Sequence, residues 1–181
     1  MRLRLPALAL LALLAGACDD RDGAAAPPPP VALTADAIGQ YCGMLLVEHP
    51  GPKGQILLRG IDRPVWFSTV RDTFAFTMLA EEAKTLRAIY VSDMGRAESW
   101  DQPGATNWVD ARRAHFVVGA DIRGGMGAAE AIPFADRAAA DRFAALHGGR
   151  VLGFTEITPD WVLGDDGAPP PAPAALHDQG H

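Results

Sequence analysis

The same order of predicted elements occurs twice along this sequence, and this repetition constrains the fold more than any other feature. Each half has two short apolar runs typical of strands, then an amphipathic helix, then a third apolar run. Strands and helices that alternate in this way are typical of an α+β domain. The sequence therefore predicts an α+β fold of two similar ββαβ units, at about residues 41–95 and 108–158.

In the first half, short and mostly apolar runs predict strands at residues 55–58, 65–67 and 87–91. A helix is predicted from about residue 69 to residue 80, because apolar side chains recur there at three- and four-residue spacing. Ser68 stands where the N-cap of this helix belongs. The first half therefore has the order ββαβ.

In the second half, strands are predicted at residues 115–118 and 130–134, and Asp136 is the predicted N-cap of the following helix. A closing strand is predicted at residues 151–157, after two glycines that end the helix. This order matches that of the first half. The predicted apolar face of the helix consists of Ala139, Phe143 and Leu146.

The first 18 residues are typical of an export signal, with two arginines, an apolar run and small residues before Cys18. The apolar run is too short to span a bilayer as a mature helix. The residues before Cys18 approximate a bacterial lipobox, which favours lipidation of this cysteine. The alternative is simple cleavage after Ala17, which leaves Cys18 as a free thiol. Either route predicts a mature protein outside the cytoplasm, and lipidation predicts one anchored at the periplasmic side of a membrane.

The composition divides the rest of the chain into three parts. Residues 19–31 are polar and then proline-rich, which predicts an extended tether. Residues 32–163 form the predicted metal-binding domain, and at about 130 residues they are enough for a core without disulfides. Residues 164–181 are predicted to be a disordered tail. The formal net charge of −6 gives no basic surface for nucleic acid, so we expect no such partner.

The stretch Tyr41–Ile56 concentrates side chains that bind soft metal ions. Cys42 and Met44 are two residues apart, and His49 follows five residues after Met44. If Cys18 is lipidated, Cys42 has no disulfide partner, which is unusual for an exported protein. Soft sulfur donors select Cu(I), whereas a structural zinc site requires about four Cys and His ligands. The stretch therefore predicts a Cu(I) site.

Each candidate ligand also has a purely structural interpretation. A lone cysteine is usually a buried small hydrophobe, and methionine usually fills a core, as we expect for Met78. His49 lies beside a Pro-Gly-Pro turn, so a solvent-exposed side chain is an equal alternative to a metal ligand. Gly43 leaves the backbone free to turn the sulfurs of Cys42 and Met44 toward one ion, which favours the metal-binding interpretation.

Several uncommon motifs, in the same order, resemble the NosL family of nitrous oxide reductase accessory proteins. They are YCGM and HPGPKGQI within residues 41–56, WFSTVRD at 66–72, YVSDMG at 90–95 and AIPFADRAAADRFAALHGGRV at 131–151. The resemblance implies a periplasmic, lipid-anchored Cu(I) chaperone that helps load the copper centres of nitrous oxide reductase. It also implies a fold related to organomercurial lyase, and Met94 of the DMG motif as a third sulfur ligand.

Three functions remain open at this point. The first is a non-enzymatic chaperone that holds Cu(I) with Cys42, Met44, Met94 and His49. By the resemblance, its partners are apo nitrous oxide reductase and a membrane transporter complex. The second is an enzyme with Cys42 as nucleophile and His49 or His115 as base, although the sequence shows no orienting triad. The third is a structural lipoprotein that binds no metal.

Overall fold

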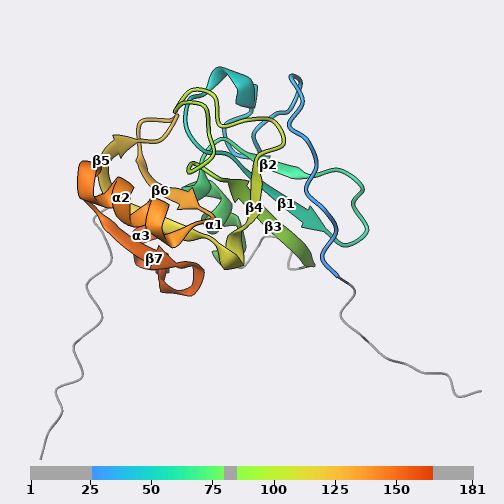
Figure 1. Cartoon of the computed structure of the whole chain (residues 1–181). Helices are drawn as coiled ribbons and strands as arrows, with labels where there is room; N and C mark the ends of the chain where they lie inside the picture. The colour runs from blue at the N-terminus through green and yellow to red at the C-terminus, as the bar shows by residue number, and fades with distance from the viewer. Residues whose placement is uncertain (1–25, 80–84, 165–181) are drawn as a thin grey trace, which may run out of the picture.

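The computed structural model describes residues 26–79 and 85–164, which form two antiparallel sheets with helices packed against them (Figure 1). The predicted α+β class is therefore confirmed. The signal peptide with Cys18 and the tail from residue 165 lie outside the described residues. Among the helices in the described ranges, none has the length and apolar character needed to cross a membrane.

The first sheet has four strands in the order β2-β1-β3-β4. Its central strand β1 (Gly54–Leu58) pairs with β2 (Val65–Phe67) on one side and β3 (Leu86–Ser92) on the other. The edge strand β4 (Trp108–Asp110) pairs with β3. Helix α1 (Val70–Met78) connects β2 to β3, so the predicted ββαβ order is present in this half.

The second sheet has three strands in the order β6-β5-β7. Its central strand β5 (His115–Arg123) lies between β6 (Ala129–Phe134) and β7 (Arg150–Gly153), and both pairings are antiparallel. Helix α2 (Arg137–His147) connects β6 to β7. In both halves the first strand is therefore central, the second and third flank it, and the helix lies between the flanking strands in sequence.

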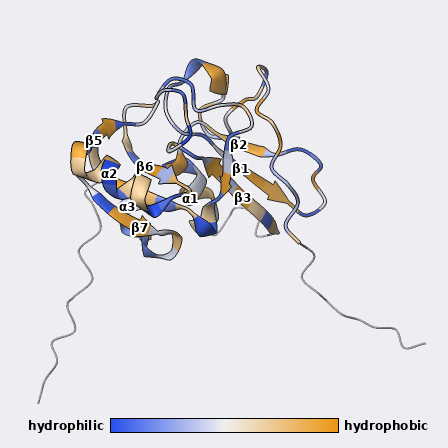
Figure 2. Cartoon of the chain, in the orientation of Figure 1, coloured by the Kyte–Doolittle hydropathy of each residue, from blue (hydrophilic) through white to orange (hydrophobic). Residues whose placement is uncertain are grey.

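The main core lies between the two sheets, with α1 in its centre. The ring of Phe74 on α1 contacts Phe116 of β5 and Phe154, with ring centroids 5.1 and 4.9 Å apart. Fully burying such a side chain contributes about 1.5–3 kcal/mol. Apolar residues colour much of β1 and β3 in Figure 2, in keeping with their place against this core. A second, smaller cluster under α2 consists of Val117, Ile132, Phe134 and Ala140.

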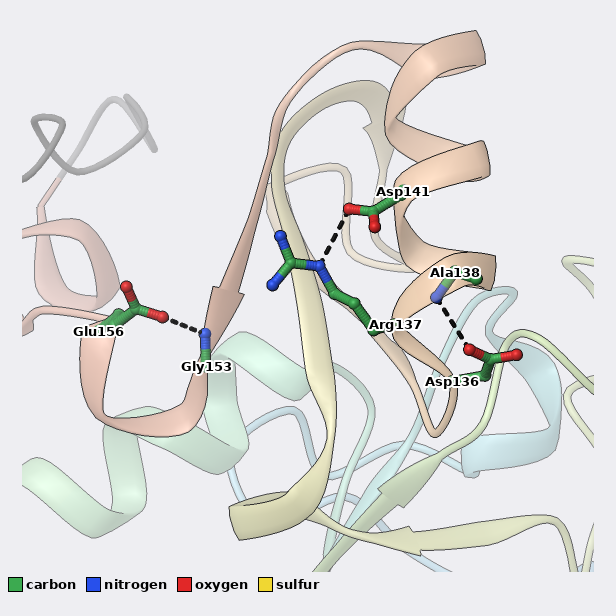
Figure 3. A network of polar contacts seen from close by, with 6 residues as sticks. All are labelled: Asp136, Arg137, Ala138, Asp141, Gly153 and Glu156. Carbon is green, nitrogen blue, oxygen red and sulfur yellow. Dashed lines mark hydrogen bonds and ion pairs between the residues drawn. The ribbon is translucent and has the colours of Figure 1, made fainter.

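The N-cap of α1 and the end of the second sheet differ from the sequence prediction. Thr69, not Ser68, caps α1, because its hydroxyl accepts the N–H of Asp72 at 3.0 Å. Strand β7 ends at Gly153, since the carboxylate of Glu156 accepts the Gly153 N–H at 2.6 Å and the chain turns into a 3-10 helix (Figure 3). The predicted strand at residues 151–157 is therefore too long.

The predicted cap of α2 is correct, but its predicted apolar face is partly wrong. Asp136 accepts the N–H of Ala138 at 2.8 Å (Figure 3). Ala140 is fully buried and Phe143 packs against the second cluster, whereas Leu146 is 80% exposed. At about 100° per residue, Leu146 lies roughly a quarter turn from the centre of the buried face.

The end of the predicted tether lies against the first sheet. The hydroxyl of Tyr90 donates to the carbonyl oxygen of Pro28 at 2.6 Å. The side chain of Gln55 pairs with the main chain of Val31, with hydrogen bonds of 2.9 and 2.8 Å. In Figure 1 the described chain begins at the lower right, at the end of the first sheet opposite the loops at the top.

Candidate metal site

Cys42 lies in the turn of a short hairpin, residues 38–45, that precedes β1. The N–H of Gly39 donates to the carbonyl oxygen of Met44 at 3.0 Å, and the N–H of Gly43 donates to that of Gly39 at 2.9 Å. Gly43 has a φ of 66°, a left-handed conformation that glycine adopts without strain. The turn leaves Cys42 half-buried and Met44 39% exposed, so both sulfur atoms belong to one hairpin near the surface.

The thiol of Cys42 packs directly against the backbone of Gly39. An ideal Cβ at Gly39 would lie 2.5 Å from Cys42 Sγ and 3.8 Å from the Ser68 nitrogen. The N–H of Gln40 donates to the carbonyl oxygen of Trp66 at 2.7 Å, which fixes the hairpin to the edge strand β2. Cys42 is therefore a free thiol held beside the end of β2.

His49 directly follows the 3-10 helix η1 (Leu46–Glu48), and its imidazole Nε2 is buried. This atom has no hydrogen-bond partner among the described residues. An ideal Cβ at Gly125 would lie 3.0 Å from His49 Cβ and 2.5 Å from the Pro50 carbonyl oxygen, so the β5–β6 loop covers the histidine. The residue is half-buried and its Nε2 is shielded from solvent, which argues against the solvent-exposed alternative. An unpaired buried polar atom costs about 1–3 kcal/mol, and a metal ion would supply the missing partner.

Met94 follows β3 at the junction of the two halves. Its N–H donates to the carbonyl oxygen of Pro133 at 2.9 Å. The preceding Asp93 is buried, and its Oδ1 accepts the N–H groups of Gly95 and Ala135, each at 3.0 Å. The Met94 side chain packs against the second core cluster, so it is held by the fold and does not lie on a free loop.

The main chain next to His49 and Met94, and the hairpin with Cys42 and Met44, lie near one end of the first sheet. Gly54 of β1 pairs with Phe67 of β2 and with Val91 of β3, so these three strand ends lie side by side. Adjacent strands are about 4.8 Å apart, which puts the ends of β2 and β3 about 10 Å apart. Cys42 approaches this span from the β2 side, and Met94 from the β3 side. In Figure 1 this end is at the top, where η1 (cyan) and the loop after β3 (yellow-green) lie.

The family of this chain is shown by its similarity to known proteins. The sequence model of the NosL family matches residues 30–162. This chain belongs to the NosL family. It is 45% identical over 163 residues to the copper-binding lipoprotein NosL of Achromobacter cycloclastes, covering 90% of this chain and 83% of the relative. It is 35% identical over 149 residues to the copper-binding lipoprotein NosL of Stutzerimonas stutzeri, covering 82% and 76%.

A solved structure from the NosL family has the same fold. The crystal structure of the copper chaperone NosL from Shewanella denitrificans is similar with a TM-score of 0.68 and 33% sequence identity. The match covers 74% of this chain and 98% of the solved chain. The resemblance inferred from the motifs is therefore confirmed at the level of both sequence and structure.

The donor set in this NosL protein fits a soft metal ion. Within residues 26–79 and 85–164, no group of three or more His, Cys, Asp or Glu side chains is placed to hold a metal ion. A metal site in these ranges therefore has to include other donors, and the thioether sulfur atoms of Met44 and Met94 are candidates. A thiolate with thioethers suits Cu(I) better than it suits zinc.

Two ionisable residues near this site are buried, which the sequence did not predict. Lys53 is 1% exposed and Glu130 is 2% exposed. Burial lowers the pKa of Lys53 to about 8, and burial raises the pKa of Glu130 to about 8. The sequence gives only a weak indication that these residues are buried. Lys53 lies in a glycine-rich loop before a strand, and Glu130 lies in an apolar strand, where a polar residue at an alternate position is normally exposed.

Proposed function

We propose that this protein is a Cu(I) chaperone that supplies copper for the assembly of nitrous oxide reductase. The observation that best supports this is the hairpin at residues 38–45, which holds Cys42 and Met44 near the surface, together with the buried Nε2 of His49, which has no partner among the described residues. The family's printed descriptions, copper-binding lipoprotein and copper chaperone, support the copper part of the proposal.

The four side chains have different roles in the proposed site. Cys42 binds as a thiolate, so Cu(I) binding releases a proton and becomes weaker as the pH falls. Met44 and Met94 are neutral thioether ligands that contribute softness without adding charge. His49 supplies an imidazole nitrogen. Because Met44 is partly exposed, this side of the ion is open to a ligand from another protein.

Delivery then proceeds by exchange of ligands between two proteins. An ion with few ligands accepts one from the acceptor before it releases one from the chaperone, so no free Cu(I) is formed. By the family resemblance, the final acceptor is apo nitrous oxide reductase, with a membrane transporter complex as an intermediary. Lipidation of Cys18 places the chaperone at the periplasmic face of the membrane.

We also propose that the domain contains two copies of one ββαβ unit and that its fold is related to organomercurial lyase. The support is the equal order of elements in the two sheets, each with its first strand in the centre. A fold related to that lyase would also suit a cysteine-dependent enzyme, the alternative function. A nucleophilic cysteine requires an adjacent base, and among the described residues neither His49 nor His115 is hydrogen-bonded to Cys42. The non-enzymatic function is therefore preferred.

The proposed function is tested in a strain that lacks this protein. We expect nitrous oxide reductase to be folded and exported but deficient in copper, most clearly when copper is scarce. Complementation with Cys42→Ser should resemble the deletion, whereas a chain truncated after Gly164 serves as the matched control and should restore the copper content. A deletion strain whose reductase has its full copper content under copper limitation would overturn the proposal.

A further inference from the structure

Lys53 is buried at the end of the first sheet near which the candidate ligands lie. Its Nζ donates hydrogen bonds to the carbonyl oxygens of Pro50 and Gly51, at 3.2 and 2.6 Å. Among the described residues no carboxylate lies within ion-pair distance of it, although attraction to the charge of Glu130 offsets part of the effect of burial on the pKa of Lys53. A buried ammonium group is costly unless polar groups compensate it, and here two main-chain carbonyls do so. The side chain therefore draws both carbonyls inward and closes the turn that directly follows His49.

The main chain of Lys53 is joined to Ser92, the last residue of β3. The N–H of Lys53 donates to Ser92 Oγ at 3.0 Å, and the carbonyl oxygen of Lys53 accepts the N–H of Ser92 at 2.9 Å. Met94 follows two residues after Ser92. Lys53 thus connects the turn after His49 with the strand end before Met94.

Close contacts at Gly51 and Gly125 pack the same turn against its neighbours on two sides. The N–H of Gly51 donates to the carbonyl oxygen of Trp100 at 2.8 Å, and an ideal Cβ at Gly51 would lie 2.9 Å from the Trp100 ring. On the other side, Gly125 packs against Pro50 so closely that its ideal Cβ would lie 2.5 Å from the Pro50 carbonyl oxygen. The turn is therefore packed between Trp100 and Gly125, while its carbonyls accept hydrogen bonds from Lys53.

We propose that Lys53 is a positioning residue for copper: its ammonium group fixes the turn at Pro50 and Gly51 and thereby sets His49 relative to Met94. This inference rests on the proposed function. Lys53 does not bind the ion itself, because an ammonium group has no lone pair to donate. Without it, the two carbonyls are buried and unpaired, and the turn rearranges to satisfy them. The imidazole of His49 then moves away, while the sulfur ligands on the hairpin and after β3 remain.

The test compares Cu(I) binding by the purified protein and by Lys53→Met, which keeps the apolar stem and removes the donors. We expect the dissociation constant for Cu(I), measured by chelator competition, to rise about tenfold, as for other residues that orient metal ligands. X-ray absorption of the Cu(I)-loaded variant should lose the imidazole scattering and keep the sulfur scattering. Ser92→Ala acts on the same connection and should produce the same change to a smaller extent.

Gln55→Leu is the matched control. Gln55, two residues further along the chain, is equally buried, but its side chain hydrogen-bonds only to the main chain of Val31 within the part of the chain that the structure describes. It should lose stability without losing the imidazole signal or the copper affinity.

A folded Lys53→Met with wild-type affinity and an intact imidazole signal would overturn this inference but not the proposed function. A wild-type spectrum without imidazole scattering would do the same. If Lys53→Met does not fold, unchanged values for Ser92→Ala overturn it. A wild-type protein that binds no Cu(I) would overturn the proposed function instead.

Discussion

The carboxyl group of Glu130 accepts a hydrogen bond from the N–H of Val70, 60 positions earlier in the chain, with an O···N distance of 3.1 Å. The same oxygen, Oε1, accepts the N–H groups of Arg71 and Ala131 at 3.0 and 2.9 Å. A side chain of β6 therefore caps the first turn of α1 and joins the two halves. The other oxygen, Oε2, is buried and unpartnered, which fits a neutral carboxylic acid.

We expect the free energy of unfolding to decrease as the pH rises from about 4.5 to about 8, because of Glu130. Burial raises the pKa of Glu130 from 4.5 to about 8. Between these values the folded state keeps a proton that the unfolded state has lost, so a higher pH favours unfolding. Glu130→Gln should flatten this part of the pH profile, measured by urea denaturation. Asp141→Asn, at an exposed ion pair with Arg137, is the control, and equal slopes in Glu130→Gln and wild type would contradict the assignment.

The order of the main elements was predictable because each leaves a local pattern in the sequence. Helix α2, for example, has a capping aspartate and ends at two glycines, and both features depend on neighbouring residues alone. Strand β4 and the final helix α3 (Pro159–Leu163) were not predicted. Both are short, and their apolar residues Trp108 and Trp161 are placed by contacts with distant parts of the chain.

The candidate site was predictable as a set of residues but not as an arrangement. Cys42 and Met44 as candidate ligands and the left-handed Gly43 follow from the local sequence, since thiolate, thioether and glycine have distinct chemistry, whereas Met94 was a candidate through the family resemblance. The burial of His49 does not follow from it, because the loop that covers this residue comes from Gly125, far along the chain. For the same reason, the role of Lys53 depends on Ser92 and became visible only in the fold.

Gly39→Ala should weaken Cu(I) binding by displacing the thiol of Cys42. The added methyl group would lie 2.5 Å from Sγ, a distance too short for any relaxed contact. Overpacking of this kind costs about 1–3 kcal/mol, so the variant should still fold. Chelator competition measures the Cu(I) affinity, and thermal denaturation measures the stability. Gly60→Ala, where the methyl group meets open space but the φ of 76° strains an alanine, should lose some stability and keep wild-type affinity. A Gly39→Ala variant with wild-type affinity would show that Cys42 is not at the site.

Met78→Ala and Met94→Ala should separate core packing from copper binding. Met78 packs against the main core and Met94 against the second cluster, so each substitution should lower the stability, by about 2 kcal/mol. Only Met94→Ala should also weaken Cu(I) binding. The two quantities are measured by urea denaturation and chelator competition on the same preparations. Weaker copper binding in Met78→Ala, with wild-type binding in Met94→Ala, would exclude Met94 as a ligand.

The anchoring prediction concerns Cys18, which lies outside the described residues. We expect the mature wild-type protein to fractionate with membranes and to carry acyl chains on Cys18, detected as added mass at its N-terminus. Cys18→Ser should block lipidation, leaving protein that is uncleaved at the lipoprotein site or soluble in the periplasm. Its domain should bind Cu(I) as before. Wild-type protein that is wholly soluble after export, with an unmodified N-terminal Cys18, would contradict lipid anchoring.

The most direct test of the copper site is an anaerobic titration of the purified protein with Cu(I), in competition with chelators, alongside Cys42→Ser. Substitution to serine removes the one thiolate, which supplies the negative charge of the site, so the variant should lose tight binding. The wild-type protein should bind one Cu(I) tightly and Zn(II) weakly, since it offers soft sulfur and too few ligands for a closed zinc site. Equal affinities for the two ions, or an unchanged Cu(I) affinity in Cys42→Ser, would contradict a copper(I) site built on Cys42.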